Sequence, residues 1–115
     1  MIKKLSCVNI TSKDPRGLAE FYRNIGVPVF VNGEDYDGWF LGNPENEGCV
    51  CVWDENNWGK ANAGYITMVF DTDDQQKTYE EIKNKGISIN PPKKADWGGL
   101  ELSLKDPDGN IVMIL

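Results

Sequence analysis

Histidine is absent from this 115-residue chain, and no part of it is a long apolar run. Without histidine, the Ser-His-Asp arrangement of many hydrolases cannot be built. A membrane-spanning helix needs about 18 consecutive apolar residues, so the sequence predicts no transmembrane segment. Residues 1–7 carry two lysines but are followed by Val-Asn-Ile-Thr-Ser, not by a long apolar stretch. That pattern argues against a secretory signal.

Basic residues are also few, with 12 Lys and Arg against 18 Asp and Glu and a net charge of −6. Such a chain repels a phosphate backbone. The nearest basic pair, Lys93 and Lys94, is expected in a solvated loop, so we expect no nucleic-acid partner. The three cysteines are an odd number. Without a secretion signal they indicate reduced thiols and a cytoplasmic location.

The most informative feature present is one layout repeated at an interval of sixty residues. In each half an alternating strand leads to an acidic residue, a helical stretch, a glycine and a new strand. The matched positions are Asp14 with Asp74 and Gly26 with Gly86. Two copies indicate a duplicated half-domain and not a solenoid. With 40% hydrophobic residues, we expect one globular domain over 1–115, with modules of about 1–54 and 63–115.

In the first module we expect a strand, a helix and three further strands. Pro15 after Asp14 is typical of a helix start, apolar positions then follow helical spacing, and Gly26 ends the helix. Alternation and turn residues predict strands at 4–11, 27–31, 39–41 and 49–53. The polar, asparagine-rich residues 54–63 are expected to be a linker.

The second module repeats this order. A strand is expected at 65–70 and a helix capped by Asp73 or Asp74. A short strand at 87–89 is expected to stop at Pro91-Pro92, and alternating leucines predict another at 100–104. The segment 106–110 reads as a tight turn, which explains its aspartates, and leads into a last strand at 111–115.

Specific residues give this layout a resemblance to a known family. They are Asp14-Pro15 followed by Phe21-Tyr22 and Gly26, together with Asp106-Pro107-Asp108-Gly109-Asn110 before the last strand. With the duplicated βαβββ unit they resemble the vicinal oxygen chelate superfamily, also called the glyoxalase/bleomycin-resistance/dioxygenase family, over nearly the whole chain. The resemblance implies an α+β fold in which two tandem βαβββ modules form a cup-shaped mixed sheet. It also implies a small-molecule site inside the cup and a homodimer.

The resemblance further assigns metal ligands, and here the chain departs from the family. Its metal enzymes hold a divalent ion with His, Glu or Gln on facing strands. The matching positions in this sequence are Cys7, Val52, Thr67 and Met113. Hard and borderline cations prefer carboxylate and imidazole ligands. We therefore expect no metal and no other cofactor.

The cysteines allow two interpretations. In the resembled fold the first and fourth strands are neighbours, so Cys7 could lie close to Cys49 or Cys51, and the thiolates could hold a soft ion or form a redox pair. Alternatively, counting from Gly48 places Val52 toward the cup and turns Cys49 and Cys51 away. Cysteine is also a common small core residue, and packing is the interpretation that the sequence favours.

Tryptophans and polar strand residues are the candidates for ligand binding. Trp39 and Trp97 are expected at the rim of the cup, where acids such as Glu34, Asp35 and Asp37 could help them to hold a flat or cationic ligand. Each tryptophan could instead belong to the core or to a dimer interface. Polar groups inside the cup, Thr11 among them, could orient the ligand. The candidate set is Cys7, Asn9, Trp39, Tyr65, Thr67, Trp97, Ser103 and Met113.

Three functions follow from these observations. The favoured one is a metal-independent small-molecule-binding protein that sequesters an antibiotic or another toxic organic compound. An alternative is a glyoxalase-like lyase or isomerase, or a dioxygenase-related enzyme, with an atypical site in which Cys7 could be catalytic. The third is a dimeric interaction module without a ligand.

Overall fold

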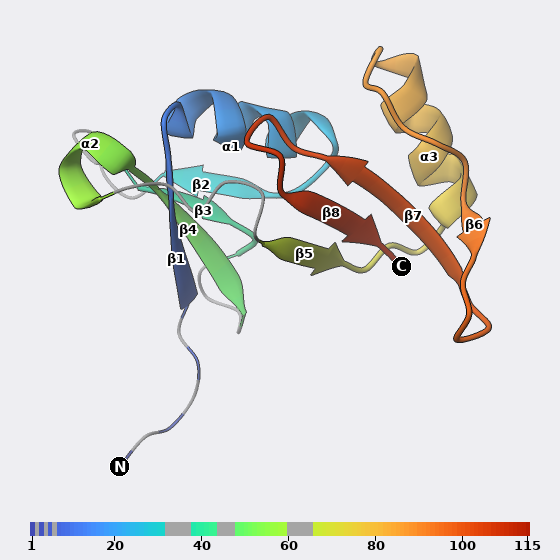
Figure 1. Ribbon diagram of the computed structural model, residues 1–115, viewed down its shortest axis with the longest axis horizontal. Coiled ribbons are helices and arrows are strands. Elements are labelled where there is room, and N and C mark those ends of the chain that lie inside the picture. Colours follow the sequence, from blue (N-terminus) through green and yellow to red (C-terminus); the bar gives the residue numbers. More distant parts are fainter. Residues whose placement is uncertain (2, 4, 6, 32–37, 44–47, 60–65) are drawn as a thin grey trace. The chain divides into compact units, whose positions relative to one another are not determined.

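The computed structural model describes residues 1–115 except 2, 4, 6, 32–37, 44–47 and 60–65. The chain divides into two compact units, Met1–Ala63 and Gly64–Leu115. Each unit has one four-stranded mixed sheet and one ten-residue helix (Figure 1). The predicted α+β class and the duplicated βαβββ order are therefore confirmed. Within the described part of the chain, no helix is long and apolar enough to cross a membrane.

The first unit follows the predicted order and adds a short helix. Its elements are β1 (Cys7–Ser12), α1 (Pro15–Asn24), β2 (Val29–Val31), β3 (Trp39–Leu41), β4 (Cys49–Asp54) and α2 (Glu55–Trp58). The strand order is β1-β4-β3-β2, with β1 parallel to β4 and the other pairs antiparallel. The stretch 54–63, which we expected to be a linker, contains this short helix, which was not predicted. Asp54 caps α2 by accepting a hydrogen bond from the backbone N–H of Asn56 at 2.9 Å.

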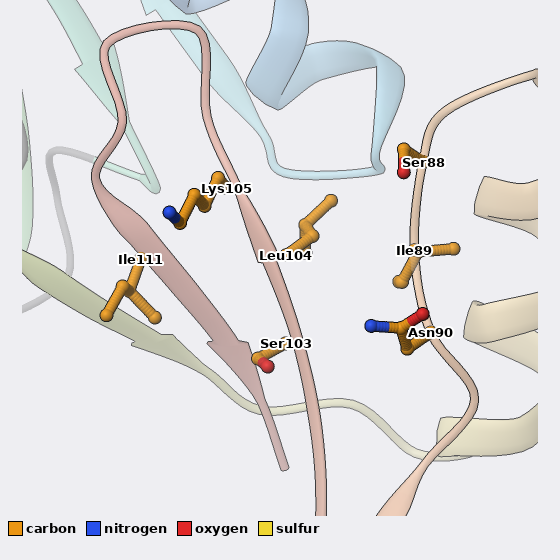
Figure 2. Close-up of a pocket in the computed structure, with 7 residues that line it drawn as sticks. All are labelled: Ser88, Ile89, Asn90, Ser103, Leu104, Lys105 and Ile111. Carbon is orange, nitrogen blue, oxygen red and sulfur yellow. The ribbon is translucent and has the colours of Figure 1, made fainter.

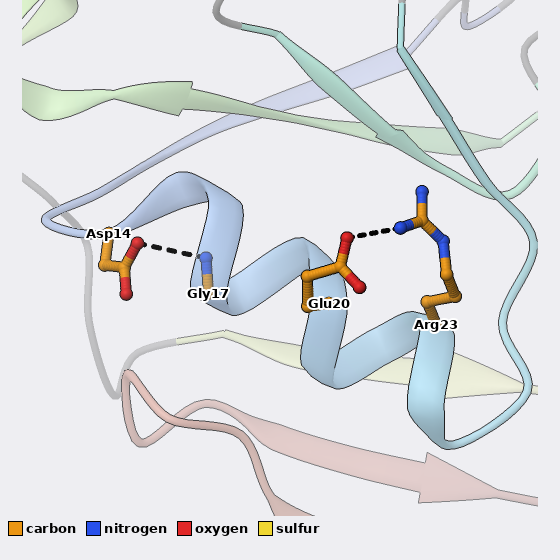
Figure 3. Close-up of polar contacts among 4 residues, drawn as sticks. All are labelled: Asp14, Gly17, Glu20 and Arg23. Atoms are coloured by element: carbon orange, nitrogen blue, oxygen red, sulfur yellow. Dashed lines mark hydrogen bonds and ion pairs between the residues drawn. The ribbon is translucent and has the colours of Figure 1, made fainter.

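Helix α1 begins at the predicted residue. The side chain of Asp14 accepts a hydrogen bond from the backbone N–H of Gly17 at 3.0 Å (Figure 3). Pro15 occupies the first turn, where a backbone N–H has no acceptor within the helix, so the N–H that proline lacks costs no hydrogen bond. Glu20 and Arg23 form an ion pair one turn apart (Figure 3), with nearly half of each side chain exposed. The local sequence therefore determines where this helix starts.

One face of the first sheet packs against α1. The helix buries Leu18, Ala19 and Tyr22. Arg16 of α1 lies over the ring of Trp39, 5.8 Å from its centroid, so Trp39 is on this face. The most buried sheet residues on the α1 side, each at 3% exposure or less, are Ile10, Ser12, Leu41 and Val52. Because side chains alternate along strands, the opposite face, which we term the Cys7 face, carries Cys7, Asn9, Thr11, Phe30, Phe40, Cys49, Cys51 and Trp53.

The second unit has the same connectivity. Its elements are β5 (Thr67–Phe70), α3 (Gln75–Asn84), β6 (Lys93–Lys94), β7 (Leu100–Lys105) and β8 (Ile111–Ile114). The strand order is β5-β8-β7-β6, and β5 is parallel to β8 as β1 is to β4. The predicted strands at both ends of this module and its helix are confirmed.

Two predictions for the second unit are wrong. Residues 87–89 form no strand, and Lys93 and Lys94 are not in a loop but pair with β7 as β6. The reason is the hairpin that follows: the backbone N–H of Ala95 donates to the carbonyl of Gly99 at 2.8 Å. This turn brings the residues directly before it alongside β7. Pro91 and Pro92 have no backbone N–H, so neither can donate a hydrogen bond to a neighbouring strand.

The second sheet also has two distinct faces. The face directed to the core carries Met68, Leu102, Leu104, Val112 and Ile114, none more than 6% exposed. We term the other the Thr67 face; it carries Thr67, Val69, Glu101, Ser103, Lys105, Ile111 and Met113. Helix α3 is tied to this sheet by Gln75, whose side-chain N–H groups donate to the carbonyls of Leu100 at 2.7 Å and Ile114 at 2.9 Å.

The sixty-residue repeat persists in the details of both helices. Asp74 accepts a hydrogen bond from the backbone N–H of Lys77 at 3.0 Å, as Asp14 does from Gly17. Of the two predicted capping residues, Asp74 is therefore the one that caps α3. Gly26 and Gly86 follow the two helices with φ of 101° and 79°, a conformation that glycine adopts without strain.

The predicted turn before β8 is also confirmed. One carboxylate oxygen of Asp106 accepts from the backbone N–H groups of Asp108 at 2.9 Å and Asn110 at 2.8 Å. The other accepts from the side-chain amide of Asn110 at 3.0 Å. Asp106 is only 5% exposed, and these bonds satisfy its buried carboxylate.

Candidate functional site

On the Cys7 face, Asn9 joins two strands through its side-chain oxygen. That oxygen accepts a hydrogen bond from the indole N–H of Trp53 at 3.0 Å and from the thiol of Cys7 at 3.6 Å. The ring of Trp53 contacts that of Trp58 on α2, with centroids 5.3 Å apart and planes tilted by 59°. Asn9 is exposed, and Trp58 is 63% exposed. These four residues, which we term the Asn9 cluster, place an amide, a thiol and two indoles within reach of a ligand.

The Cys7 face also holds the other two cysteines. In the parallel β1–β4 pair, Cys7 is the partner of Cys49, and Asn9 is the partner of Cys51. Partner residues on adjacent strands project to the same side of a sheet. The prediction that Cys49 and Cys51 turn away from the face of Cys7 is therefore wrong. The proximity of Cys7 to Cys49, which the sequence left open, is settled by this register.

Val52 lies on the α1 side of the sheet, where its partner is Ile10, so its predicted position beside Cys7 is also wrong. Val52 was misplaced because its position was obtained by counting four residues from the turn glycine Gly48, as Met113 follows Gly109. β4 begins one residue after Gly48, whereas β8 begins two residues after Gly109. A shift of one residue reverses the face of every side chain in a strand.

Burial distinguishes the thiols. Cys7 is half-buried, whereas Cys49 is 5% exposed and Cys51 is 1% exposed; all three are thiols and not disulfides. Burial, followed by the neighbouring Cys7, raises the pKa of the Cys49 thiol above its usual range. Cys49 is therefore protonated at neutral pH, since a buried thiolate is poorly solvated.

The second unit brings three predicted residues onto one surface. Thr67, Ser103 and Met113 all lie on the Thr67 face, where Ser103 and Met113 are Cα partners. Thr67 and Ser103 are exposed and Met113 is half-buried. This face therefore offers two hydroxyl groups and a thioether to an approaching molecule.

Ser103 also lines a cavity of about 450 Å³ in this unit. Figure 2 shows the segment 88–90 facing β7 across it. The lining residues are Ser88, Ile89, Asn90, Ser103, Leu104, Lys105 and Ile111. Small-molecule sites typically enclose about 300 to 1,000 Å³ and combine apolar walls with a few polar groups. This hollow has a volume in that range and a mixed lining, but it is open to solvent.

The remaining predicted residues lie elsewhere. Trp39 stacks with Arg16 on the α1 side of the first sheet, the side opposite to Cys7 and Asn9. Trp97 is 64% exposed in the β6–β7 turn, where its indole N–H donates to the carboxylate of Glu101 at 2.7 Å. It borders a smaller hollow of about 270 Å³. Tyr65 and the acids Glu34, Asp35 and Asp37 fall outside the described residues.

The positions that the resemblance assigns to a metal do not fit one. Cys7 lies on the Cys7 face and Val52 on the α1 side of the first sheet, while Thr67 and Met113 lie on the Thr67 face of the second sheet. Thiol, hydroxyl and thioether groups are poor ligands for Mg²⁺, Mn²⁺ or Fe²⁺. Among the residues described, no group of three or more His, Cys, Asp or Glu side chains is arranged to hold an ion.

Trp53 and Trp58 are the residues of this surface that sequence reasoning left out of the site. The resemblance made the first and fourth strands neighbours, and this was the signal that could have brought Trp53 near Asn9. The parallel register, which only the structure shows, places residues 49, 51 and 53 on the face of residues 7, 9 and 11. Trp58 could not have been placed, because its helix was not predicted.

Comparison with known proteins identifies the fold. The model of the Glyoxalase/Bleomycin resistance protein/Dioxygenase superfamily matches residues 4–114. A bleomycin resistance determinant encoded on the transposon Tn5 is 21% identical, with a TM-score of 0.71 over 97% of this chain and 96% of that chain. An antibiotic-binding protein from a Streptomyces species is 17% identical, with a TM-score of 0.76 over 98% and 94%. Lactoylglutathione lyase from Agrobacterium tumefaciens is 16% identical, with a TM-score of 0.73 over 99% and 93%. A comparison with curated protein sequences gave no match.

Proposed function

The chain belongs to the Glyoxalase/Bleomycin resistance protein/Dioxygenase superfamily, and on this premise we propose that it is a metal-independent protein that binds and sequesters a small organic molecule. The molecule would be an antibiotic or another toxic compound. Two proteins of similar fold support this proposal, because one is a bleomycin resistance determinant and the other an antibiotic-binding protein. The positions that the resemblance assigns to a metal, Cys7, Val52, Thr67 and Met113, carry no carboxylate or imidazole, which supports binding over catalysis.

The observation that carries the proposal is the Asn9 cluster. Trp53 and Trp58 form a tilted aromatic pair beside an exposed amide. Aromatic rings bind flat ligands by stacking, and cations by attraction to the ring face. The net charge of −6 favours a cationic ligand by long-range attraction. A planar, positively charged organic molecule is thus the ligand class that this surface suits best.

Binding can be tested by following tryptophan fluorescence while the protein is titrated with a panel of antibiotics that includes cationic aromatic compounds. We expect at least one member to change the emission with saturation. A panel without any response would support the third function, an interaction module without ligand. Native mass spectrometry of freshly purified protein provides an independent test, because a sequestering protein retains part of its ligand.

Two measurements separate metal-independent binding from the enzyme alternative. If the protein binds its ligand without a metal, elemental analysis of protein purified without chelators should find no stoichiometric Zn, Ni, Mn or Fe. One bound ion per chain would contradict metal-independent binding. Replacing Cys7 with Ser should leave ligand binding nearly intact; a lyase activity abolished by this change would support the enzyme instead.

We also propose that two chains associate. The Thr67 face exposes the apolar side chains of Val69 and Ile111, at 55% and 41%, and pairing would remove them from water. Sedimentation analysis should show a dimer at micromolar concentration. A monomer there would count against the pairing and leave the binding proposal unaffected.

A further inference from the structure

Two thiols from distant parts of the sequence are direct neighbours on the Cys7 face. Cys7 begins β1 and Cys49 begins β4, and the two are Cα partners in the parallel pair. Adjacent strands lie about 4.8 Å apart, and the Cα atoms of a disulfide are about 4.4 to 6.8 Å apart. Both side chains project to the same side of the sheet. This register can therefore accept a bridge without moving either strand by a residue.

The third cysteine is less well placed for either partner. Cys51 is the partner of Asn9, two residues further along the strands. A rise of about 3.3 Å per residue puts its Cα about 6.6 Å from that of Cys49 and, diagonally, about 8 Å from that of Cys7. The diagonal separation between Cys7 and Cys51 exceeds the range that a disulfide can span. Cys49 and Cys51 project in parallel from one strand, so their Cβ atoms are also about 6.6 Å apart, beyond the about 3.5 to 4.5 Å that a disulfide needs. Cys7 and Cys49 are therefore the best-placed pair.

The two partner thiols differ in access. Cys7 is half-buried and its thiol donates to the exposed side chain of Asn9 at 3.6 Å. Cys49 is 5% exposed. An oxidant from solvent therefore reaches Cys7 first, while Cys49 is protected from it but lies beside the Cys7 sulfur. This is the arrangement of an attacked thiol and a resolving thiol.

We propose that Cys7 and Cys49 are a reversible oxidation site that closes to a disulfide when the protein meets a peroxide. The Cys7 thiolate attacks one oxygen of the peroxide, the O–O bond breaks, and Cys7 becomes a sulfenic acid while water or an alcohol leaves. The sulfur of Cys49 then attacks the Cys7 sulfur, the S–O bond breaks, and the second oxygen leaves as water. The two thiols supply the two electrons and two protons. A dithiol reductant restores both thiols by exchange.

Formation of the Cys7–Cys49 disulfide would alter the Asn9 cluster even when no ligand is bound. The Cys7 sulfur loses its hydrogen, so Asn9 keeps the Trp53 indole as donor but loses Cys7. The bridge also joins the edge strand β1 covalently to β4. A link that closes a long loop restricts the unfolded chain, so the oxidised protein should have a higher Tm than the reduced one. This proposal does not depend on the small-molecule-binding function.

Mass spectrometry of protein treated with hydrogen peroxide tests the site. The reduced chain is exposed to a small excess, the remaining thiols are blocked with an alkylating agent, and the chain is digested. We expect an intramolecular bridge between the Cys7 and Cys49 peptides, a loss of two hydrogens from the intact mass, and full reversal by dithiothreitol. Cys7→Ser and Cys49→Ser should abolish the bridge, whereas Cys51→Ala should retain it.

Three results would overturn the proposal: over-oxidation of Cys7 without a bridge, a bridge to Cys51, or a bridge between two chains. Should the serine variants fold poorly, the wild-type chain still decides the question. Dibromobimane becomes fluorescent when it links two adjacent thiols, and peptide mapping of the reduced protein should find it across Cys7 and Cys49. Attachment to any other pair would contradict the register on which the proposal rests.

Discussion

Trp53 donates its indole N–H to the side-chain oxygen of Asn9 at 3.0 Å, from β4 to the adjacent β1. The two residues are 44 positions apart in sequence. Their bond holds one indole of the Trp53–Trp58 pair at a defined orientation beside the Cys7 thiol. A preorganised aromatic surface loses less entropy when a ligand binds.

Removing the acceptor tests this relationship. Asn9→Ala should lower the free energy of unfolding by about 1 kcal/mol, because the indole N–H loses its partner at a position that water can reach only in part. The tryptophan emission should also change. Chemical denaturation measures the first effect. Asn9→Asp is the matched control, since a carboxylate oxygen can accept the same bond and should preserve most of the stability. Equal stability of the alanine variant and wild type would show that the bond contributes nothing.

Two tryptophans of nearly equal exposure distinguish the proposed binding surface from the hairpin. Trp58 is 63% and Trp97 is 64% exposed, so truncating either should cost little stability. For a ligand found in the titration panel, Trp58→Ala should weaken binding about tenfold, equivalent to about 1.4 kcal/mol. Trp97→Ala should leave the affinity nearly unchanged. Calorimetric titration measures both, and the reverse ranking would move the binding site to the β6–β7 turn.

The helix caps should contribute equally in the two units. Asp14→Ala and Asp74→Ala each remove an acceptor at 3.0 Å from a backbone N–H, so each should destabilise its helix by about 1 kcal/mol. Asp73→Ala, beside the second cap, is the control and should change stability by less than about 0.5 kcal/mol. Urea denaturation of the three variants gives the comparison. A loss at Asp73 equal to that at Asp74 would refute the assigned cap.

Stability should decline in alkaline solution because of Cys49. Burial and the adjacent Cys7 raise the pKa of the Cys49 thiol in the folded chain, whereas the unfolded thiol titrates near about 8.5. Above that pH the unfolded state loses its proton more readily than the folded state, so the free energy of unfolding falls as pH rises. Below it both states are protonated and the dependence vanishes.

Comparing Cys49→Ala with wild type isolates this contribution. Tyrosine and lysine titrations are common to both proteins, so the wild type should show the steeper loss of stability between neutral and alkaline pH. Cys7→Ser should reduce the slope partly, because Cys7 is the second cause of the raised pKa. Parallel pH profiles for wild type and Cys49→Ala would contradict the assignment.

Elements with strong local signals could be predicted from the sequence. Helix α1 has a capping acid, a proline, helical spacing and a glycine stop, and all four operate as expected. Elements with weak local signals were predicted wrongly or missed. Residues 87–89 had strand-like composition but no partner strand, and α2 depends on a single capping aspartate in a polar stretch. A strand needs a neighbour for its hydrogen bonds, and local sequence does not name that neighbour.

The candidate site was harder to predict than the fold. Asn9, Thr67 and Ser103 were placed by alternation on the side opposite to the apolar residues of their strands, as the structure has them. Cys49 and Cys51 were placed on the wrong face, because a count from the preceding glycine assumed turns of equal length in the two halves. One residue of difference was enough to reverse the result.

By itself, the sequence determined the duplicated layout, the starts of α1 and α3 and the absence of imidazole ligands, because these depend on residue type and on spacing within one element. Only the tertiary structure decided which residues from different strands meet. The pairing of β1 with β4 put Cys7 beside Cys49, and packing on the far side of that sheet took Trp39 to Arg16. Register between distant strands is set by which apolar face is buried. Which face is buried depends on how all the helices and strands of the unit pack together.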